Sequence, residues 1–392
     1  MGRFSREGAV INRATKRLLG VLLSAALAMA SVAVSAAALN FGAKIVFESQ
    51  SFQITHRNGI RVVEYMLKQR PDIYGEDSEI IPHPYLLYSN KGGFFGKGFL
   101  QTDDAGYRIV PQPNRSNTER PKRILVLGGS TTFSYPYVPN PANAWPSQLQ
   151  RVLGAGFEVI NGGLSSATTA ELLAGYIFRH RYLRPDIVII HEGGNDVLAM
   201  MFENYNAEYS HLRAPGTRPI AGPMDRAALK WGGWPAKLLY AHNWNVVTTV
   251  FSPLPFDLSA VPPNDALDRA EHAPTTGFER NLDLLVRTII DDGAMPVLFG
   301  FAQAREQLIS RNRPDLIGRE HAWIVGVERN LEIMKRIASR RHLVYLDPHD
   351  FKADDDWFLD NCHLNEQGEV AKAAFVAAGI FQSSVHSAAG AK

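Results

Sequence analysis

Five short apolar runs, separated by helical stretches, constrain the fold of this chain more than any other feature. They are RILVLG (123–128), FEVIN (157–161), DIVIIHE (186–192), MPVLFGF (295–301) and HLVYLD (342–347). Near-continuous apolar strands that alternate with helices are typical of a parallel sheet covered by helices on both faces. The sequence therefore predicts an α/β domain over residues 121–382.

The segments around these runs suggest how the rest of the chain is organised. Residues 168–183 and 276–294 repeat apolar side chains at helical spacing, and the second segment closes near Gly293. Residues 41–120 are mixed and punctuated by Pro and Gly, and we interpret them as an extension that wraps the domain. Residues 197–273 form a long insertion between the third and fourth strands, where lids and binding loops are common. We expect the tail, 383–392, to be disordered.

The N-terminus predicts export from the cytoplasm. Residues 18–39, LLGVLLSAALAMASVAVSAAAL, carry no charge and follow five basic residues: Arg3, Arg6, Arg13, Lys16 and Arg17. This run exceeds the roughly 7–15 apolar residues of a signal-peptide core and reaches the roughly 20 that span a bilayer. We expect residues 1–40 to form an inner-membrane anchor, with the following chain on the periplasmic side.

Two alternatives to an anchor stay open at this point. The small residues from Ser35 to Ala38 would suit a signal peptidase, and the cleaved protein would then be secreted. A buried helix of a cytosolic domain is disfavoured, because such a helix would show a polar stripe that this segment lacks.

Charge and cysteine content exclude several classes of protein. The 41 basic and 39 acidic side chains nearly balance, whereas a nucleic-acid-binding protein has a clear basic excess. Cys362 is the only cysteine, so the chain forms no internal disulfide and has no zinc site built from several thiolates.

Polar blocks follow the predicted strands at the edge where ligands bind in open α/β sheets. The first strand leads into Gly128-Gly129-Ser130-Thr131-Thr132, the second into Asn161-Gly162-Gly163-Leu164-Ser165-Ser166, and the third into Gly193-Gly194-Asn195-Asp196. Asp360-Asn361-Cys362-His363 precedes a C-terminal helix. Ser130 is placed as a nucleophile on an exposed turn, although a lone serine after glycines more often only caps a helix.

Together, these four ordered blocks resemble the SGNH, or GDSL-like, hydrolase family over about residues 122–382. The resemblance implies a three-layer α/β/α sandwich with a five-stranded parallel sheet of flavodoxin-like order. It also implies that Ser130 is the nucleophile, that His363 is the general base, and that Asp360 orients it. The family's chemistry uses neither a metal nor an organic cofactor.

The resemblance further implies an oxyanion hole formed by the N–H groups of Ser130 and Ser166 and by the Asn195 side chain. Two departures are visible. The first block reads Gly-Gly-Ser-Thr rather than Gly-Asp-Ser-Leu, and Ser166 stands where the family has its oxyanion glycine. A serine still has a backbone N–H to donate, and Gly163 is the alternative donor.

The expected function is a serine esterase of the cell envelope that cleaves a small-molecule or glycan ester through an acyl-serine intermediate. An O-acyltransferase that acts on envelope glycans with the same triad is the nearest alternative. A non-catalytic envelope binding module is a third, which the complete triad disfavours. Neither a Gly-x-Gly-x-x-Gly fingerprint nor a Walker A loop follows the first strand, so we do not expect a nucleotide site.

Other polar residues have simpler interpretations. We expect His191 to be a structural residue and Cys362 not to be a catalytic thiol. Asp354 to Asp356, with Asp347 and His349 upstream, are expected in a solvated loop because they lack the spacing of metal ligands. The aromatic residues of the insertion either line a cleft or attach the insertion to the body; they are Trp231, Trp234, Tyr240 and Trp244.

Overall fold

The computed structural model describes residues 4–68, 79–83, 85–114, 120–202, 205–209, 223–251 and 258–389. The chain divides into two compact units. The smaller comprises Met1–Lys68 and Ala221–Val250, and the larger comprises Gln69–Ile220 and Phe251–Lys392. This division differs from the expected linear order of anchor, extension and hydrolase domain, because part of the insertion folds with the N-terminal helices.

The larger unit is built on a five-stranded parallel sheet with the order β6-β5-β7-β8-β9. Its strands are β5 (Lys122–Gly128), β6 (Phe157–Asn161), β7 (Ile187–His191), β8 (Met295–Phe299) and β9 (Val344–Leu346). Counted along the chain, this order is 2-1-3-4-5, the flavodoxin-like arrangement. The predicted fold is confirmed.

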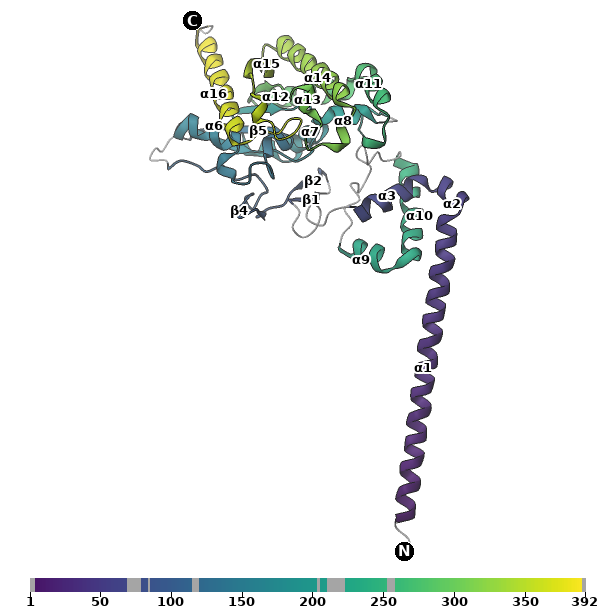
Figure 1. Ribbon diagram of the computed structural model, residues 1–392. Coiled ribbons are helices and arrows are strands. Elements are labelled where there is room, and N and C mark those ends of the chain that lie inside the picture. The colour runs from purple at the N-terminus through teal and green to yellow at the C-terminus, as the bar shows by residue number, and fades with distance from the viewer. Residues whose placement is uncertain are drawn as a thin grey trace. The chain divides into compact units, whose positions relative to one another are not determined.

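Helices cover both faces of this sheet (Figure 1). On β5, Ile124 and Val126 pack into one core with α6 (Trp145–Leu153) and α16 (Glu366–Ala389), whereas Leu125 and Leu127 face the other. The second core contains α7 (Thr169–Phe178), α8 (Asn195–Met201), α11 (Pro263–His272), α12 (Thr276–Asp291) and α14 (Glu320–Arg341). Burial on both faces explains why each strand is a continuous apolar run.

Short elements complete the larger unit. They are the helices α5 (Ser130–Phe133), α13 (Glu306–Ile309) and α15 (Pro348–Phe351), and 3₁₀ turns at Pro141–Asn143, Gly154–Gly156, His180–Leu183, Leu258–Ala260, Pro314–Leu316 and Asp355–Trp357. The helix expected over 168–183 ends earlier, at Phe178, and a 3₁₀ turn follows.

The C-terminal tail differs from the expectation of disorder. Helix α16 continues to Ala389, and residues 390–392 lie outside the described part of the chain. The sequence SSVHSAA contains neither Gly nor Pro, so nothing in it stops the helix before Gly390.

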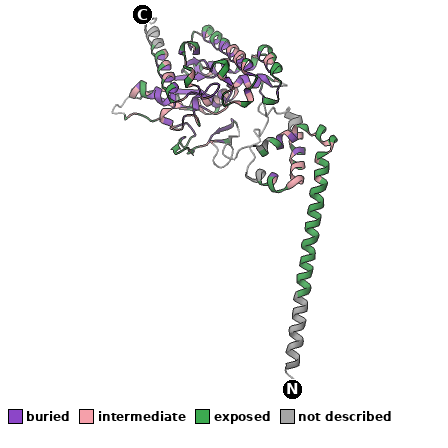
Figure 2. Cartoon of the chain, in the orientation of Figure 1, coloured by how far each residue is buried: buried purple, intermediate pink, exposed green. Residues whose placement is uncertain are grey.

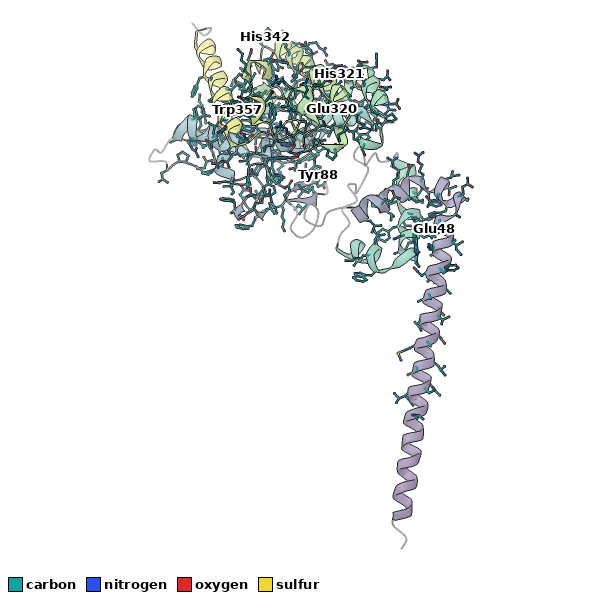
Figure 3. All side chains as sticks on the ribbon, viewed as in Figure 1. Glu48, Tyr88, Glu320, His321, His342 and Trp357 are labelled. Carbon is teal, nitrogen blue, oxygen red and sulfur yellow. The ribbon has the colours of Figure 1, made fainter. Side chains whose placement is uncertain are left out.

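The predicted extension, 41–120, divides between the two units. In the larger unit it forms two small antiparallel sheets, β1 (Ile80–His83) with β2 (Leu87–Asn90), and β3 (Phe95–Gly96) with β4 (Phe99–Leu100). Tyr88, labelled in Figure 3, donates from its hydroxyl to the carbonyl oxygen of Ser165 at 2.9 Å. Asn90 donates to the carbonyl oxygen of Gly163 at 2.8 Å. This segment therefore braces the loop that follows β6.

The smaller unit is helical. It contains α1 (Phe4–Glu48), α2 (Gln50–Thr55), α3 (Arg57–Lys68), α9 (Pro223–Trp231) and α10 (Gly233–Phe251). Helix α3 lies within residues 41–120, which we interpreted as an extension that wraps the domain, but it belongs to the smaller unit and buries Ile60, Val62 and Val63.

Helix α1 is apolar from Leu18 to Ala43, and its described side chains are exposed except those of Ala43 and Phe47, which are half-buried (Figure 2). By length and composition, Leu19–Glu48 can cross a membrane, and none of its most apolar window is buried. Its exposure is inconsistent with a helix in the core of a cytosolic domain, whereas both an anchor and a signal sequence fit.

Candidate active site

Ser130 begins α5 directly after β5, on a turn that two glycines make possible. A Cβ on Gly128 would lie 2.3 Å from Thr132 Oγ1 and 2.4 Å from the carbonyl oxygen of His191. On Gly129, it would lie 2.3 Å from Asn195 Nδ2. The absence of a side chain at Gly129 thus lets the Asn195 amide closely approach the nucleophile turn, the turn at the proposed nucleophile Ser130.

Buried hydrogen bonds fix this turn to α6 and α16. The carbonyl oxygen of Thr131 accepts from Trp145 Nε1 at 3.0 Å and from Lys372 Nζ at 3.1 Å. Ser134 Oγ donates to Glu369 Oε2 at 2.7 Å. Burial lowers the pKa of Lys372 to about 8 and raises the pKa of Glu369. These hydrogen bonds offset the energetic cost of burying the polar side chains that hold the turn in place.

Ser130, His363 and Asp360 form one hydrogen-bonded chain. His363 Nε2 lies 2.8 Å from Ser130 Oγ, and His363 Nδ1 lies 2.9 Å from Asp360 Oδ1 and 2.8 Å from Oδ2. The backbone N–H groups of Cys362 and His363 also donate to Asp360 Oδ1, at 2.9 and 2.8 Å. An imidazole held in this way can accept a proton from the serine hydroxyl.

The electrostatics of Asp360 suit an orienting carboxylate. Burial by itself raises its pKa, but the hydrogen bond and charge of His363 and the two backbone N–H groups outweigh burial and lower the pKa to about 2. Asp360 is 1% exposed, so its ionised form is stabilised almost entirely by protein groups.

Tyr137 is a site residue that the sequence did not reveal. Its ring stacks on the imidazole of His363, with centroids 3.7 Å apart and planes within 11°. Burial and the charge of Asp360 raise the pKa of the Tyr137 hydroxyl, which stays neutral. The sequence around it, Tyr135-Pro136-Tyr137, indicates a turn, but no periodicity connects it with residue 363.

The candidate oxyanion donors have different surroundings. Asn195 Nδ2 donates to the carbonyl oxygen of Ala167 at 2.7 Å, which leaves the amide a second N–H. Ser166 has φ +61°, in the left-handed region that favours glycine. The N–H of Gly163 donates to Asn161 Oδ1 at 2.9 Å and is thereby engaged.

Two buried carboxylates lie behind Asn195. Glu192 Oε1 accepts the backbone N–H groups of Gly193 at 3.1 Å and of Asn195 at 3.3 Å. Burial and the neighbouring Asp196 raise the pKa of Glu192 well above its ordinary value. Burial also raises the pKa of Asp196, to about 6, although it accepts hydrogen bonds from Thr169. These contacts fix the backbone from which the Asn195 amide extends.

Ser130 and His363 open into a cleft of about 290 Å³. Leu198, Phe301 and Trp323 form an apolar part of its wall, and Arg313 contributes a guanidinium group. Arg313 is held by Asp315, through contacts of 2.9 and 2.7 Å, and by Asn361 at 3.0 Å. The remaining lining residues are Glu79, Tyr135, Pro136, Tyr137, Ser165, Ser166, Asn195 and Cys362.

The other candidates have structural surroundings. His191 is 1% exposed and stacks on Phe299, with ring centroids 4.3 Å apart. Cys362 is buried, and burial raises its pKa well above the ordinary value, so its thiol is neutral. Its Sγ lies 3.5 Å from His363 Nδ1, the nitrogen that faces Asp360.

Around the acidic loop, Asp355 pairs with Arg305, and Asp347 Oδ1 lies 2.8 Å from His349 Nδ1. Among the described residues, the cluster of three or more potential metal ligands is Asp360, Cys362 and His363, within the triad itself. The aromatic residues of the insertion belong to the smaller unit.

Comparison with known proteins gives a family match. Residues 126–371, more than half of the chain, match the sequence model of the GDSL-like Lipase/Acylhydrolase family. No curated protein matches significantly.

Several solved structures resemble the chain. A putative lipolytic protein of the G-D-S-L family from Desulfitobacterium hafniense DCB-2 is 15% identical, with coverage of 66% of this chain and 99% of that one and a TM-score of 0.38. An acetylxylan esterase from Geobacillus stearothermophilus, solved as a catalytic mutant, is 14% identical, with coverage of 66% and 94% and a TM-score of 0.38. A lipase/acylhydrolase from Enterococcus faecalis is 15% identical, with coverage of 66% and 95% and a TM-score of 0.39.

Proposed function

Because the chain belongs to the GDSL-like lipase/acylhydrolase family and is an ester-hydrolysing enzyme, we propose that it cleaves a carboxylic ester through an acyl-Ser130 intermediate. One observation supports this mechanism above the others. His363 Nε2 lies 2.8 Å from Ser130 Oγ while its other ring nitrogen contacts Asp360. A base oriented by a third group is the arrangement that activates a serine nucleophile.

The reaction follows from these positions. Ser130 Oγ attacks the ester carbonyl carbon as its proton passes to His363 Nε2, and Asp360 stabilises the imidazolium that forms. The tetrahedral intermediate collapses, and the leaving alkoxide takes the proton from Nε2. A water molecule, deprotonated by His363, then attacks the acyl carbon, which releases the carboxylic acid and restores Ser130. This chemistry needs no metal or organic cofactor.

The negative charge of the tetrahedral intermediate needs preorganised donors. We assign this role to the backbone N–H groups of Ser130 and Ser166 and to the second N–H of Asn195. Gly163 is the weaker candidate, because its N–H already donates to Asn161.

The substrate is a small-molecule or glycan ester, and the cleft of about 290 Å³ beside Ser130 is where its acyl group would bind. The apolar wall of Leu198, Phe301 and Trp323 suits the acyl chain. With α1 as a membrane anchor, the enzyme acts on the extracytoplasmic side of the inner membrane.

A direct test compares aryl acetate and aryl octanoate as substrates of the purified full-length protein. Ser130→Ala should lower kcat at least 1,000-fold, because no other group can form the acyl-enzyme. Ser339→Ala, on the exposed surface of α14, is the matched control. Turnover by Ser130→Ala equal to that of the control would refute the assignment.

Two further measurements separate the alternatives. A serine-directed phosphonate should label the wild-type enzyme on Ser130, and absence of labelling would favour a non-catalytic binding module. Product analysis with an added glycan acceptor distinguishes hydrolysis from O-acyl transfer. Free acid as the main product supports an esterase, and acylated glycan as the main product would identify an acyltransferase.

A further inference from the structure

The extracytoplasmic end of α1 is bound by part of the insertion, within the smaller unit. The backbone N–H of Trp234 donates to Asn40 Oδ1 at 2.9 Å. The ring centroids of Trp234 and Phe47 lie 5.4 Å apart. A Cβ on Gly233 would lie 2.4 Å from Asn40 Oδ1, and Gly233 has φ +63°. The insertion thus approaches α1 at a position where only glycine fits.

The depth of this contact along α1 follows from helix geometry. An α-helix rises about 1.5 Å per residue, so about 20 residues cross a hydrocarbon core of about 30 Å. The uncharged run continues from Leu18 to Ala43, so a core counted back from Lys44, the next charged residue, spans about residues 24–43. Asn40 then lies near the outer edge of the hydrocarbon, Lys44 lies at its boundary, and Phe47 lies about 5 Å beyond it, in the headgroup layer. Trp234 contacts both Asn40 and Phe47 and therefore lies at the same level.

The side chains at this level have the composition of a membrane interface. Lys237 Nζ lies 4.3 Å from the centre of the Trp234 ring, and Lys44 Nζ lies 5.8 Å from it. Trp231 is 79% exposed, and Lys230 Nζ lies 5.2 Å from the centre of its ring. Trp is enriched where hydrocarbon meets headgroups, and lysine attracts anionic lipids.

A second set of contacts holds the insertion in place. Asn245 Nδ2 donates to the carbonyl oxygen of Thr55 at 3.0 Å, and His242 Nδ1 lies 3.0 Å from His56 Nε2. Helices α3 and α10 approach so closely that a Cβ on Gly59 would lie 1.8 Å from the carbonyl oxygen of Ala241. The aromatic and basic residues are therefore mounted on a packed scaffold beside the end of α1.

We propose that Trp231, Trp234, Lys44, Lys230 and Lys237 form a headgroup collar that binds the outer surface of the membrane crossed by α1. The collar's lysines contact the phosphates of anionic lipids, and its indoles lie at the boundary with the hydrocarbon. This role rests on the proposed membrane anchoring of α1. It gives part of the insertion a partner, a lipid surface, that is distinct from the ester substrate.

The test uses the full-length protein in nanodiscs made with lipids brominated either just below the headgroup or near the bilayer centre. Bromine quenches tryptophan fluorescence at short range, so its depth reports the depth of the indoles. We expect the shallow label to quench more strongly than the deep label. The double variant Trp231→Phe, Trp234→Phe should lose at least half of this quenching.

Trp357→Phe is the matched control, because Trp357 belongs to the larger unit and is only partly exposed. It should leave the bromine quenching unchanged. Replacing Lys44, Lys230 and Lys237 by Gln should reduce quenching at least twofold in anionic nanodiscs and leave it unchanged in zwitterionic ones. Esterase activity on a soluble aryl ester should stay within twofold in every variant.

The outcomes separate the collar from the anchor. Intact mass and resistance to alkaline extraction report whether α1 is retained in the membrane. If the chain is retained and the double variant quenches like wild type, the collar is refuted while the anchor stands. If the chain is cleaved or extracted, both are refuted. Quenching that persists in the double variant but disappears on addition of a soluble glycan would instead identify a sugar-binding surface.

Discussion

Replacing Asp360 by asparagine tests the proposed mechanism most sharply. Asp360 Oδ1 accepts the backbone N–H groups of Cys362 and His363, so the oxygen of an asparagine amide must take this position. The amide nitrogen then replaces Oδ2, which lies 2.8 Å from His363 Nδ1. Because this nitrogen is a donor, Nδ1 must become an acceptor, and the ring proton moves to Nε2.

That tautomer cannot accept the proton of Ser130. In a serine triad, such a change lowers kcat by about 10⁴, which corresponds to about 5 kcal/mol of transition-state stabilisation. We therefore expect Asp360→Asn to lose about 10⁴ in kcat on an aryl acetate, with KM within about threefold. Asp356→Asn, a change of the same kind at an exposed position in the preceding loop, should retain wild-type activity.

The same variant should also change how the free energy of unfolding depends on pH. The pKa of Asp360 is lowered from its ordinary value to about 2, so the ionised carboxylate stabilises the fold by about 2 kcal/mol above pH 4. This contribution is lost as pH falls from about 4 to about 2. Asparagine does not titrate, so urea unfolding of the variant should lack this part of the pH dependence. An Asp360→Asn enzyme with kcat within tenfold of wild type would refute the proposed role of Asp360.

Three further substitutions follow from the site. Tyr137→Leu should lower kcat about tenfold at similar KM, because a stacked ring contributes about 1.4 kcal/mol to holding the imidazole. Tyr137→Phe keeps the ring and should stay within about threefold. Equal losses in steady-state assays would contradict this role. Ser166→Gly should raise the free energy of unfolding by about 1 kcal/mol, because the φ of +61° at this position strains any residue with a Cβ. A denaturant midpoint of the variant at or below that of wild type would argue against this strain. Relative to wild type, Glu192→Gln should gain free energy of unfolding as pH rises from 5 to 9. The raised pKa of Glu192 makes the wild-type native state bind an extra proton, so wild type loses stability with increasing pH, whereas glutamine does not titrate. Parallel curves of stability against pH for variant and wild type would count against this prediction.

The strands could be predicted from local apolar runs, and the proximity of Ser130, His363 and Asp360 could be predicted from the order of the motifs that resemble the family. The run FEVIN coincides with β6, and the flavodoxin-like strand order agrees with the expectation from the family resemblance. The structure brings Ser130 and His363 together as the ordered motifs implied. Each of these signals is carried by a few adjacent residues.

Contacts between distant segments that no motif marks could not be predicted. Tyr137 reaches His363 through the path of a loop, and Trp234 contacts Asn40 although 194 residues separate them. Helix α3 is a different case, because Ile60, Val63 and Leu67 recur at helical spacing. Gly59 and the flanking charged residues obscured that pattern, and the close approach to Ala241 explains why glycine occupies this position.

The attachment of the nucleophile turn to α16 has a consequence for biosynthesis. Ser130 emerges from the ribosome 233 residues before His363, and Glu369 and Lys372 follow later still. A nascent chain that ends before His363 therefore has Ser130 without the imidazole proposed as its base. Its turn at Ser130 also lacks the buried hydrogen bonds to Glu369 and Lys372. Under the proposed mechanism, esterase activity can appear only after α16 has been synthesised and docked, so a nascent chain that lacks α16 is catalytically silent.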